Sequence, residues 1–205
     1  MNFLNSKTEV ANKQHSTSRP SAEEAEEAVR TLLRWAGDDP AREGLIDTPA
    51  RVVRAYREWF AGYDKDPEEL LERTFEEVSG YSEMVTLKDI RFESFCEHHL
   101  APIIGVVHVS YIPKGRVVGI SKIARLVDAF SKRLQVQEKM TSQIANTLQT
   151  TLKPYGVAVL VEGDHHCMCT RGVHKTTSNM ISSAFTGDYL KKQKLKDEFL
   201  KIIGK

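Results

Sequence analysis

Apolar positions in the first part of the chain recur at helical spacing. Residues 22, 25, 29, 32, 33 and 36 are apolar and follow one face of a 3.6-residue period. Ser21 and Glu24 have the spacing of a capping box immediately before this stretch. The pattern therefore predicts an amphipathic helix from residue 22 to about residue 36. Thr48 followed by Pro49 predicts the start of a second helix, because proline needs no N–H partner in a first helical turn.

From about residue 83 the pattern changes to the alternation that is typical of strands. Ile103, Val107, Val109 and Tyr111 occupy alternate positions, as residues on the buried face of a strand do. The predicted elements are strands 84–95 and 103–111, helices 121–133 and 137–153, strands 157–168 and 178–185, and a last helix 190–203. Ser121 is expected to cap the first of these helices. Consecutive strand pairs with helices between them indicate an α+β fold with a largely antiparallel sheet.

Composition excludes several classes of protein. The 205 residues contain 29 Lys and Arg against 28 Asp and Glu, and a net charge of +1 requires neither a nucleic-acid nor a membrane partner. No apolar run approaches the roughly 18–20 residues of a membrane-spanning helix. The first residues lack the basic start and apolar stretch of a secretory signal, so a cytoplasmic protein is expected. Residues 1–20 are polar and predict a disordered tail, followed by a helical region over 21–80 and a sheet-containing domain over 81–205.

Two clusters of thiols and imidazoles stand out, Cys96-Glu-His-His99 and His165-His-Cys-Met-Cys169. Cys96 and His99 are three residues apart, a spacing that a tight turn or a helix brings onto one side. If the strand predicted from residue 157 continues through the second cluster, its period of two places His165, Cys167 and Cys169 on one face. Thiolates together with an imidazole are a donor set that suits Zn²⁺.

The spacing leaves three interpretations of these clusters open. A site made of Cys96, His99 and Cys167 leaves one coordination position for water and indicates catalysis. Cys169 as a fourth ligand would instead close a structural Cys₃His site. The same thiols could also pack in a core or take part in redox chemistry. Histidines beside the presumed ligands could transfer protons near neutral pH, which favours the catalytic interpretation.

Charged side chains at predicted helix starts indicate where an anion could bind. Lys122 and Arg125 fall in the first turn of a predicted helix, where free N–H groups and the helix dipole favour an anion, although a solvated helix start has the same pattern. Arg51 and Arg54 lie three residues apart on the helix that follows Thr48, on a face that is either solvated or turned toward an anion. Glu138, at the start of the next predicted helix, is also a favourable first-turn residue.

Six ordered motifs resemble those of one known family, GTP cyclohydrolase I, over roughly residues 22–203. They are Thr48-Pro-Ala-Arg51, Cys96-Glu-His-His-Leu100, Gly119-Ile-Ser-Lys-Ile-Ala-Arg125, Leu134-Gln-Val-Gln-Glu138, His165-His-Cys-Met168 and Arg171-Gly-Val173. The resemblance implies the tunnelling fold, an antiparallel four-stranded sheet with two helices on one face, preceded by an N-terminal helical region. It also implies conversion of GTP and water to formate and 7,8-dihydroneopterin triphosphate, by a homodecamer of two pentamers with active sites between subunits.

The resemblance also implies a role for individual residues. Those carried over from the motifs are Cys96, His99 and Cys167 as Zn²⁺ ligands; His98, His165 and Ser121 as catalytic residues; Glu138 and Gln137 at the guanine; and Lys122, Arg125, Arg171, Arg51 and Arg54 at the triphosphate. His165 would protonate N7 of the purine, and Ser121 would assist around the ribose. Glu138 would accept hydrogen bonds from guanine N1–H and the 2-amino group, donors that adenine lacks.

One thiol does not belong to the resemblance. Cys169 stands at a position where the family motif has no cysteine, and it could share a strand face with Cys167. Two other classes of protein have part of the same pattern. One is a different tunnelling-fold enzyme, such as a nitrile reductase of the queuosine pathway or a second-type cyclohydrolase. The other is a non-catalytic module that zinc stabilises.

Overall fold

The computed structural model describes residues 19–72, 74–75 and 83–205, and the tail predicted over residues 1–20 lies almost wholly outside them. The chain divides into two compact units, residues 1–54 and 55–205, each of which is described by itself. Among the described residues, no helix is long and apolar enough to cross a membrane.

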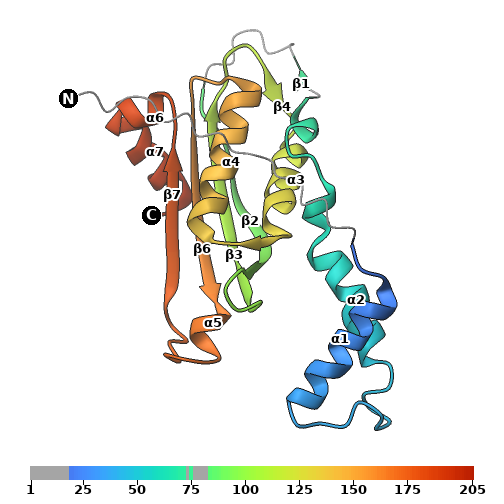
Figure 1. Ribbon diagram of the computed structural model, residues 1–205. Helices are drawn as coiled ribbons and strands as arrows, with labels where there is room; N and C mark the ends of the chain where they lie inside the picture. Colours follow the sequence, from blue (N-terminus) through green and yellow to red (C-terminus); the bar gives the residue numbers. More distant parts are fainter. Residues whose placement is uncertain (1–18, 73, 76–82) are drawn as a thin grey trace, which may run out of the picture. The chain divides into compact units, whose positions relative to one another are not determined.

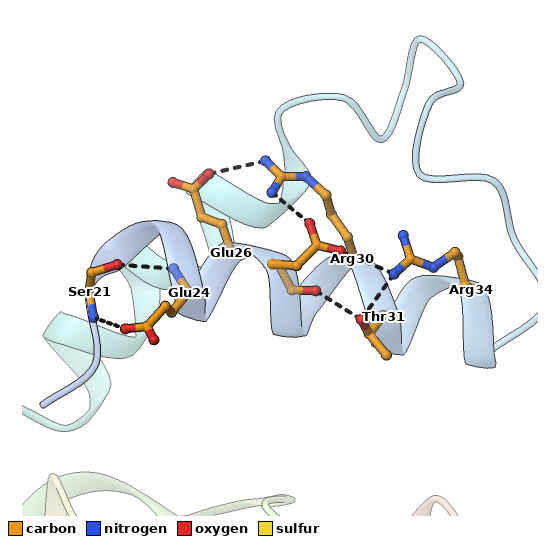
Figure 2. Close-up of polar contacts among 7 residues, drawn as sticks. Ser21, Glu24, Glu26, Arg30, Thr31 and Arg34 are labelled. Carbon is orange, nitrogen blue, oxygen red and sulfur yellow. Dashed lines mark hydrogen bonds and ion pairs between the residues drawn. The ribbon is translucent and has the colours of Figure 1, made fainter. Parts of the chain in front are cut away.

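The two predicted helices come first in the chain, one within the first unit and the other across the boundary that follows residue 54. Helix α1 (Ala22–Trp35) begins with the predicted capping box, in which the Glu24 N–H donates to the Ser21 hydroxyl and the Ser21 N–H donates to the Glu24 carboxylate (Figure 2). Further along the helix, Arg30 pairs with Glu26 at 3.2 Å, one turn away. Helix α2 (Thr48–Trp59) starts where the Thr-Pro pair predicts. The two helix predictions are confirmed.

A mixed sheet forms the centre of the second unit, and its strand order is β5-β2-β3-β6-β7 (Figure 1). The four long strands pair antiparallel; they are β2 (Val85–Cys96), β3 (Pro102–Ile112), β6 (Gly156–His165) and β7 (Asn179–Phe185). The fifth, β5 (Leu134–Gln135), is parallel to the last two residues of β2. The expectation of four strands is therefore wrong by one, because a two-residue strand is too short to show a period.

Two helices cover one face of this sheet, as predicted. They are α3 (Ile120–Ser131) and α4 (Gln137–Leu152), which pack on β2 and on β6 and β7 respectively. The side chains between helices and sheet are fully buried, among them Val107, Val159 and Ile144. Together with the antiparallel sheet, this arrangement confirms the α+β prediction and matches the expected tunnelling fold.

The opposite face of the sheet carries the end of the chain. Ala158 and Leu160 alternate with the core-facing valines of β6, and they pack against Tyr189 and Phe199. These two aromatic residues belong to α6 (Asp188–Lys191) and α7 (Gln193–Ile203), which replace the single predicted last helix. The remaining short elements are the 3-10 helices η1 (Ala61–Asp64) and η2 (Glu69–Leu71), the helical turn α5 (His166–Cys169), and the strand pair β1 (Thr74–Phe75) and β4 (Val117–Val118).

Two further predictions about element ends are wrong. Strand β6 stops at His165, and the chain then turns into α5, so Cys167 and Cys169 are not on a common strand face with His165. Helix α3 begins at Ile120 after Gly119, and Ser121 makes no capping bond to it. Ser121 therefore lies inside the first turn with its side chain exposed.

Candidate metal centre and active site

The candidate site lies at the end of the sheet where β2 and β6 finish and where β3 and α4 begin (Figure 1). A tight turn follows Cys96, in which the N–H groups of His99 and Leu100 both donate to the Cys96 carbonyl, at 3.3 and 2.9 Å. Leu100 takes a left-handed backbone with φ of 54°, and Ala101 then accepts a hydrogen bond from the Cys96 N–H. The turn folds His99 back over Cys96, as the three-residue spacing predicts.

The third donor arrives from β6. Its last residue, His165, is paired with Ile103 at the start of β3, so the chain that follows lies beside the Cys96 turn. In α5 the Thr170 N–H and hydroxyl both donate to the His166 carbonyl, which closes one helical turn around Cys167. One ligand atom from each of Cys96, His99 and Cys167 lies within 4.8 Å of the others.

These three donors fit a single soft or borderline metal ion. Cys96 is buried, Cys167 is half-buried and His99 is exposed, so the group opens to solvent on one side. Burial raises the pKa of the Cys167 thiol, and the neighbouring Cys96 raises it further. A cation bound by both sulfurs would instead lower the pKa of Cys167, because its positive charge stabilises the thiolate and screens its repulsion by Cys96.

Cys169 does not join this group. Its Sγ donates to the Lys175 carbonyl at 3.4 Å, and within the described part of the chain the only set of three or more clustered donors is Cys96, His99 and Cys167. With three protein ligands, a tetrahedral ion keeps one position for a non-protein ligand. The geometry therefore favours an open site over a closed Cys₃His site.

Two histidines flank the three donors. His98 is exposed, and its Nδ1 lies 3.6 Å from Cys96 Sγ. His165 is half-buried, and its Nε2 lies 2.9 Å from Gln137 Oε1. Burial lowers the pKa of His165, while the charges of Glu138 and Asp164 oppose that effect. His98 therefore lies beside a metal donor, and His165 lies at the end of β6, two residues before the donor Cys167.

Glu138 and Gln137 occupy the first turn of α4 but differ sharply in exposure. The Glu138 carboxylate is exposed near His165, where a ligand can reach it. Gln137 is 1% exposed, and its amide is bonded entirely to protein groups. The arrangement gives no surface through which the Gln137 side chain would touch a substrate. Nothing in the sequence distinguishes these neighbours, because both are ordinary first-turn residues.

The predicted phosphate-binding residues fall into separate places. Arg171 lies at the site, where its Nη1 is 3.2 Å from His99 Nε2. Ser121 and Lys122 lie in the first turn of α3, about 15 Å along the helix axis from its last residue, Ser131. The chain after Ser131 enters β5, which pairs with the end of β2 at Cys96. One chain therefore does not bring these residues to the metal donors.

The other predicted cations lie on two different helices, α3 and α2. Arg125 is exposed one turn further along α3 than Ser121. Arg51 and Arg54 belong to the first unit, where Arg51 bonds to the Thr48 hydroxyl at 3.2 Å and lies 3.5 Å from the Asp47 carboxylate.

Comparisons with known proteins find one family over most of the chain. The family model described as GTP cyclohydrolase I matches residues 25–204. The protein named GTP cyclohydrolase 1 of Maricaulis maris is 59% identical over 186 residues, which are 91% of this chain and 91% of that protein. The protein of the same name from Brucella canis is 56% identical over 185 residues, 90% of this chain and 87% of that protein. Among solved structures, the apo form of the archaeosine synthase QueF-Like aligns with 51% of this chain and 93% of its own, at a TM-score of 0.42 and 24% identity.

Proposed function

Because this chain belongs to the GTP cyclohydrolase I family, we propose that it hydrolyses the imidazole ring of GTP at C8, releases formate and forms 7,8-dihydroneopterin triphosphate. The observation that carries the proposal is the open group of Cys96, His99 and Cys167 with two histidines beside it. A purely structural metal site would need neither the open position nor the flanking imidazoles.

Cys96, His99 and Cys167 would hold Zn²⁺, because two thiolates and an imidazole are donors that this ion prefers. When bound, the ion supplies a water activated for nucleophilic attack at neutral pH. The same donor set accepts other borderline ions, so the metal content of the purified protein is the measurement that identifies it.

The remaining steps are assigned to the chain's own side chains. His165 would protonate N7 of the purine, which makes C8 more electrophilic, and His98 would assist the later proton transfers. The exposed Glu138 carboxylate would accept hydrogen bonds from guanine N1–H and the 2-amino group. Adenine lacks both donors and would leave a desolvated carboxylate unpaired, which costs several kcal/mol. ATP is therefore expected to be converted at least about a thousandfold less efficiently than GTP.

The triphosphate-binding residues support a site shared between subunits. Arg171 lies beside the metal donors, but Lys122 lies in the first turn of α3, far along the helix from them. We propose that Lys122 and Arg125 of a second copy, with Arg51 and Arg54, complete the phosphate site, and that Ser121 assists at the ribose. Arginine forks suit bidentate contact with phosphate.

The sheet itself has edges that a second copy could cover. Among the described residues, the outer edge of β2 is paired only at Phe95 and Cys96, and β7 is paired only with β6. Unpaired strand edges are templates for pairing with another chain. We propose that copies of this chain assemble edge to edge into rings, as a decamer of two pentamers.

Co-expression of two inactive variants tests the shared site. Cys96→Ala removes a metal donor, and Lys122→Ala removes a phosphate contact. If each site takes its metal donors from one copy and Lys122 from another, equal random mixing leaves both contributions unaltered in one site of four. Mixed assemblies should therefore recover about a quarter of the normal number of active sites. The control mixture, Cys96→Ala with His165→Ala, alters the same end of one chain and should stay inactive. Equal recovery in both mixtures, or none in the first, would contradict a site built from two copies.

A further inference from the structure

We infer that Gln137 is a positioning residue for His165: its side-chain carbonyl holds the Nε2–H of the imidazole and leaves Nδ1 as the nitrogen that exchanges a proton with the substrate. The inference rests on the proposed function, in which His165 transfers a proton to the purine. It differs from the expectation that the Gln137 side chain binds the guanine directly.

The orientation of the Gln137 amide is fixed by its surroundings. Its Nε2 lies within hydrogen-bond distance of three acceptors that share its two hydrogens, the Val161 carbonyl at 3.2 Å, the Met180 carbonyl at 2.9 Å and the Ser182 hydroxyl at 3.1 Å. Main-chain carbonyls only accept hydrogen bonds, so the NH₂ end of the amide must face them. Gln137 as a whole is 1% exposed, so bulk water does not compete for these positions. Oε1 is left pointing at His165.

The orientation of the amide determines which ring nitrogen of His165 carries the proton. Gln137 Oε1 lies 2.9 Å from His165 Nε2, and an amide oxygen can only accept, so Nε2 must be the donor. In the neutral imidazole the other nitrogen, Nδ1, then has a free lone pair. A proton gained at Nδ1 is the one that the ring can give to a bound purine, while the Nε2–H bond holds the ring in place.

A glycine makes room for this contact. Gly163 lies two residues before His165 on β6, and a Cβ at this position would lie 2.6 Å from Gln137 Oε1 and 3.1 Å from the Ile103 side chain. Any larger residue at 163 would therefore push the amide oxygen away from the position that meets His165. The strand end that presents His165 is built around the Gln137 side chain.

Chemical modification of His165 tests the inference without relying on turnover. Diethylpyrocarbonate acylates an accessible unprotonated ring nitrogen, and peptide mass spectrometry of the metal-loaded full-length protein reports the rate at His165. In Gln137→Met the Nε2–H tautomer is no longer fixed and Nδ1 is no longer held as the unprotonated nitrogen, so acylation of His165 should become about five- to tenfold slower, the factor that corresponds to one hydrogen bond. The matched control is Ser182→Ala, which removes one partner of the same amide but keeps the contact with His165. Its rate should stay within about twofold of the unaltered protein.

Kinetics with GTP separate a positioning role from a merely structural one. Gln137→Met should lower kcat about 10- to 100-fold and leave KM within about threefold of the unaltered protein. A positioned general acid accelerates a reaction by a factor of roughly 10²–10⁴, and this substitution removes only its alignment. In a His165→Ala background the same substitution should have no further effect on kcat, since Gln137 acts through that ring.

Each outcome decides between the positioning role and its alternatives. An unchanged acylation rate in Gln137→Met, or an equal loss of kcat in the His165→Ala background, would overturn the inference. If Gln137→Met does not fold, Gly163→Ala provides the same test, because its added methyl group displaces the same oxygen. If the unaltered protein converts no GTP, the proposed function fails, whereas the acylation rates still report whether Gln137 holds His165.

Discussion

Replacement of His99 by alanine should remove the metal without disturbing the fold. The His99 side chain is exposed; its Nδ1 lies 3.9 Å from Cys96 Sγ, its Nε2 lies 3.2 Å from Arg171 Nη1, and its ring meets the His98 ring edge-on. Four-ligand zinc sites bind with about 10–16 kcal/mol, or roughly 3–4 kcal/mol for each ligand. Loss of one ligand therefore predicts binding weaker by at least about a hundredfold. Because the ring is exposed, the free energy of unfolding of the metal-free protein should change by less than about 0.5 kcal/mol.

Two measurements check this prediction on the same preparation. Competition with a chromophoric chelator gives the affinity for Zn²⁺, and urea unfolding of the metal-free protein gives the stability. His166→Ala is the matched control, because His166 lies next to Cys167 but outside the donor group, and it should retain normal affinity. Unaltered zinc affinity in His99→Ala, or a loss of equal size in His166→Ala, would refute the assignment of His99 as a ligand.

Substitutions at Glu138, Cys169 and Glu162 test other parts of the structure. Glu138→Ala should lose most GTP affinity in equilibrium binding while the zinc content stays normal, because the carboxylate is exposed and is no metal donor; full affinity would remove Glu138 from the guanine site. Cys169→Ala should keep its full complement of zinc, since the thiol bonds to the Lys175 carbonyl; loss of metal would restore the closed site. Burial alone would raise the pKa of Glu162, but hydrogen bonds and charges from Lys205 and His108 lower it overall. The stability from this group is therefore present above the unfolded pKa of about 4.3 and is lost as the pH falls through the lower folded pKa. Glu162→Gln should be less stable than the unaltered chain by about 1 kcal/mol at pH 7, because Lys205 is partly exposed, and the difference should vanish near pH 2; a difference that persists there would contradict the ion pair.

The sequence was most informative where local rules determine the structure. The capping box at Ser21 and the apolar stripe after it predict α1 to within one residue of its observed end. The spacing of Cys96 and His99 likewise indicates a shared ligand position, because the turn that folds one over the other involves only neighbouring residues.

Features that depend on distant partners were not predictable in the same way. The alternating His-Cys pattern after residue 165 is typical of a strand, but the β6–β7 pairing stops at Asp164 and Asn179, which leaves the cysteines free to form a helical turn. Strand β5 exists only because Leu134 meets the end of β2. Gln137 is buried only because β6 and β7 supply carbonyls for its amide. In each case the deciding contact joins segments that are remote in the sequence.

Ring opening of GTP by this chain is proposed to depend on a metal ion held by Cys96, His99 and Cys167. The most direct test is to incubate the zinc-loaded protein with GTP and measure formate release together with pterin fluorescence after oxidation. Parallel samples contain ATP in place of GTP, or a chelator with and without added zinc. Formate and pterin are expected in equal amounts from GTP alone, abolished by chelation and restored by zinc. No formate from GTP in protein shown to contain one zinc ion per chain would contradict the proposed function.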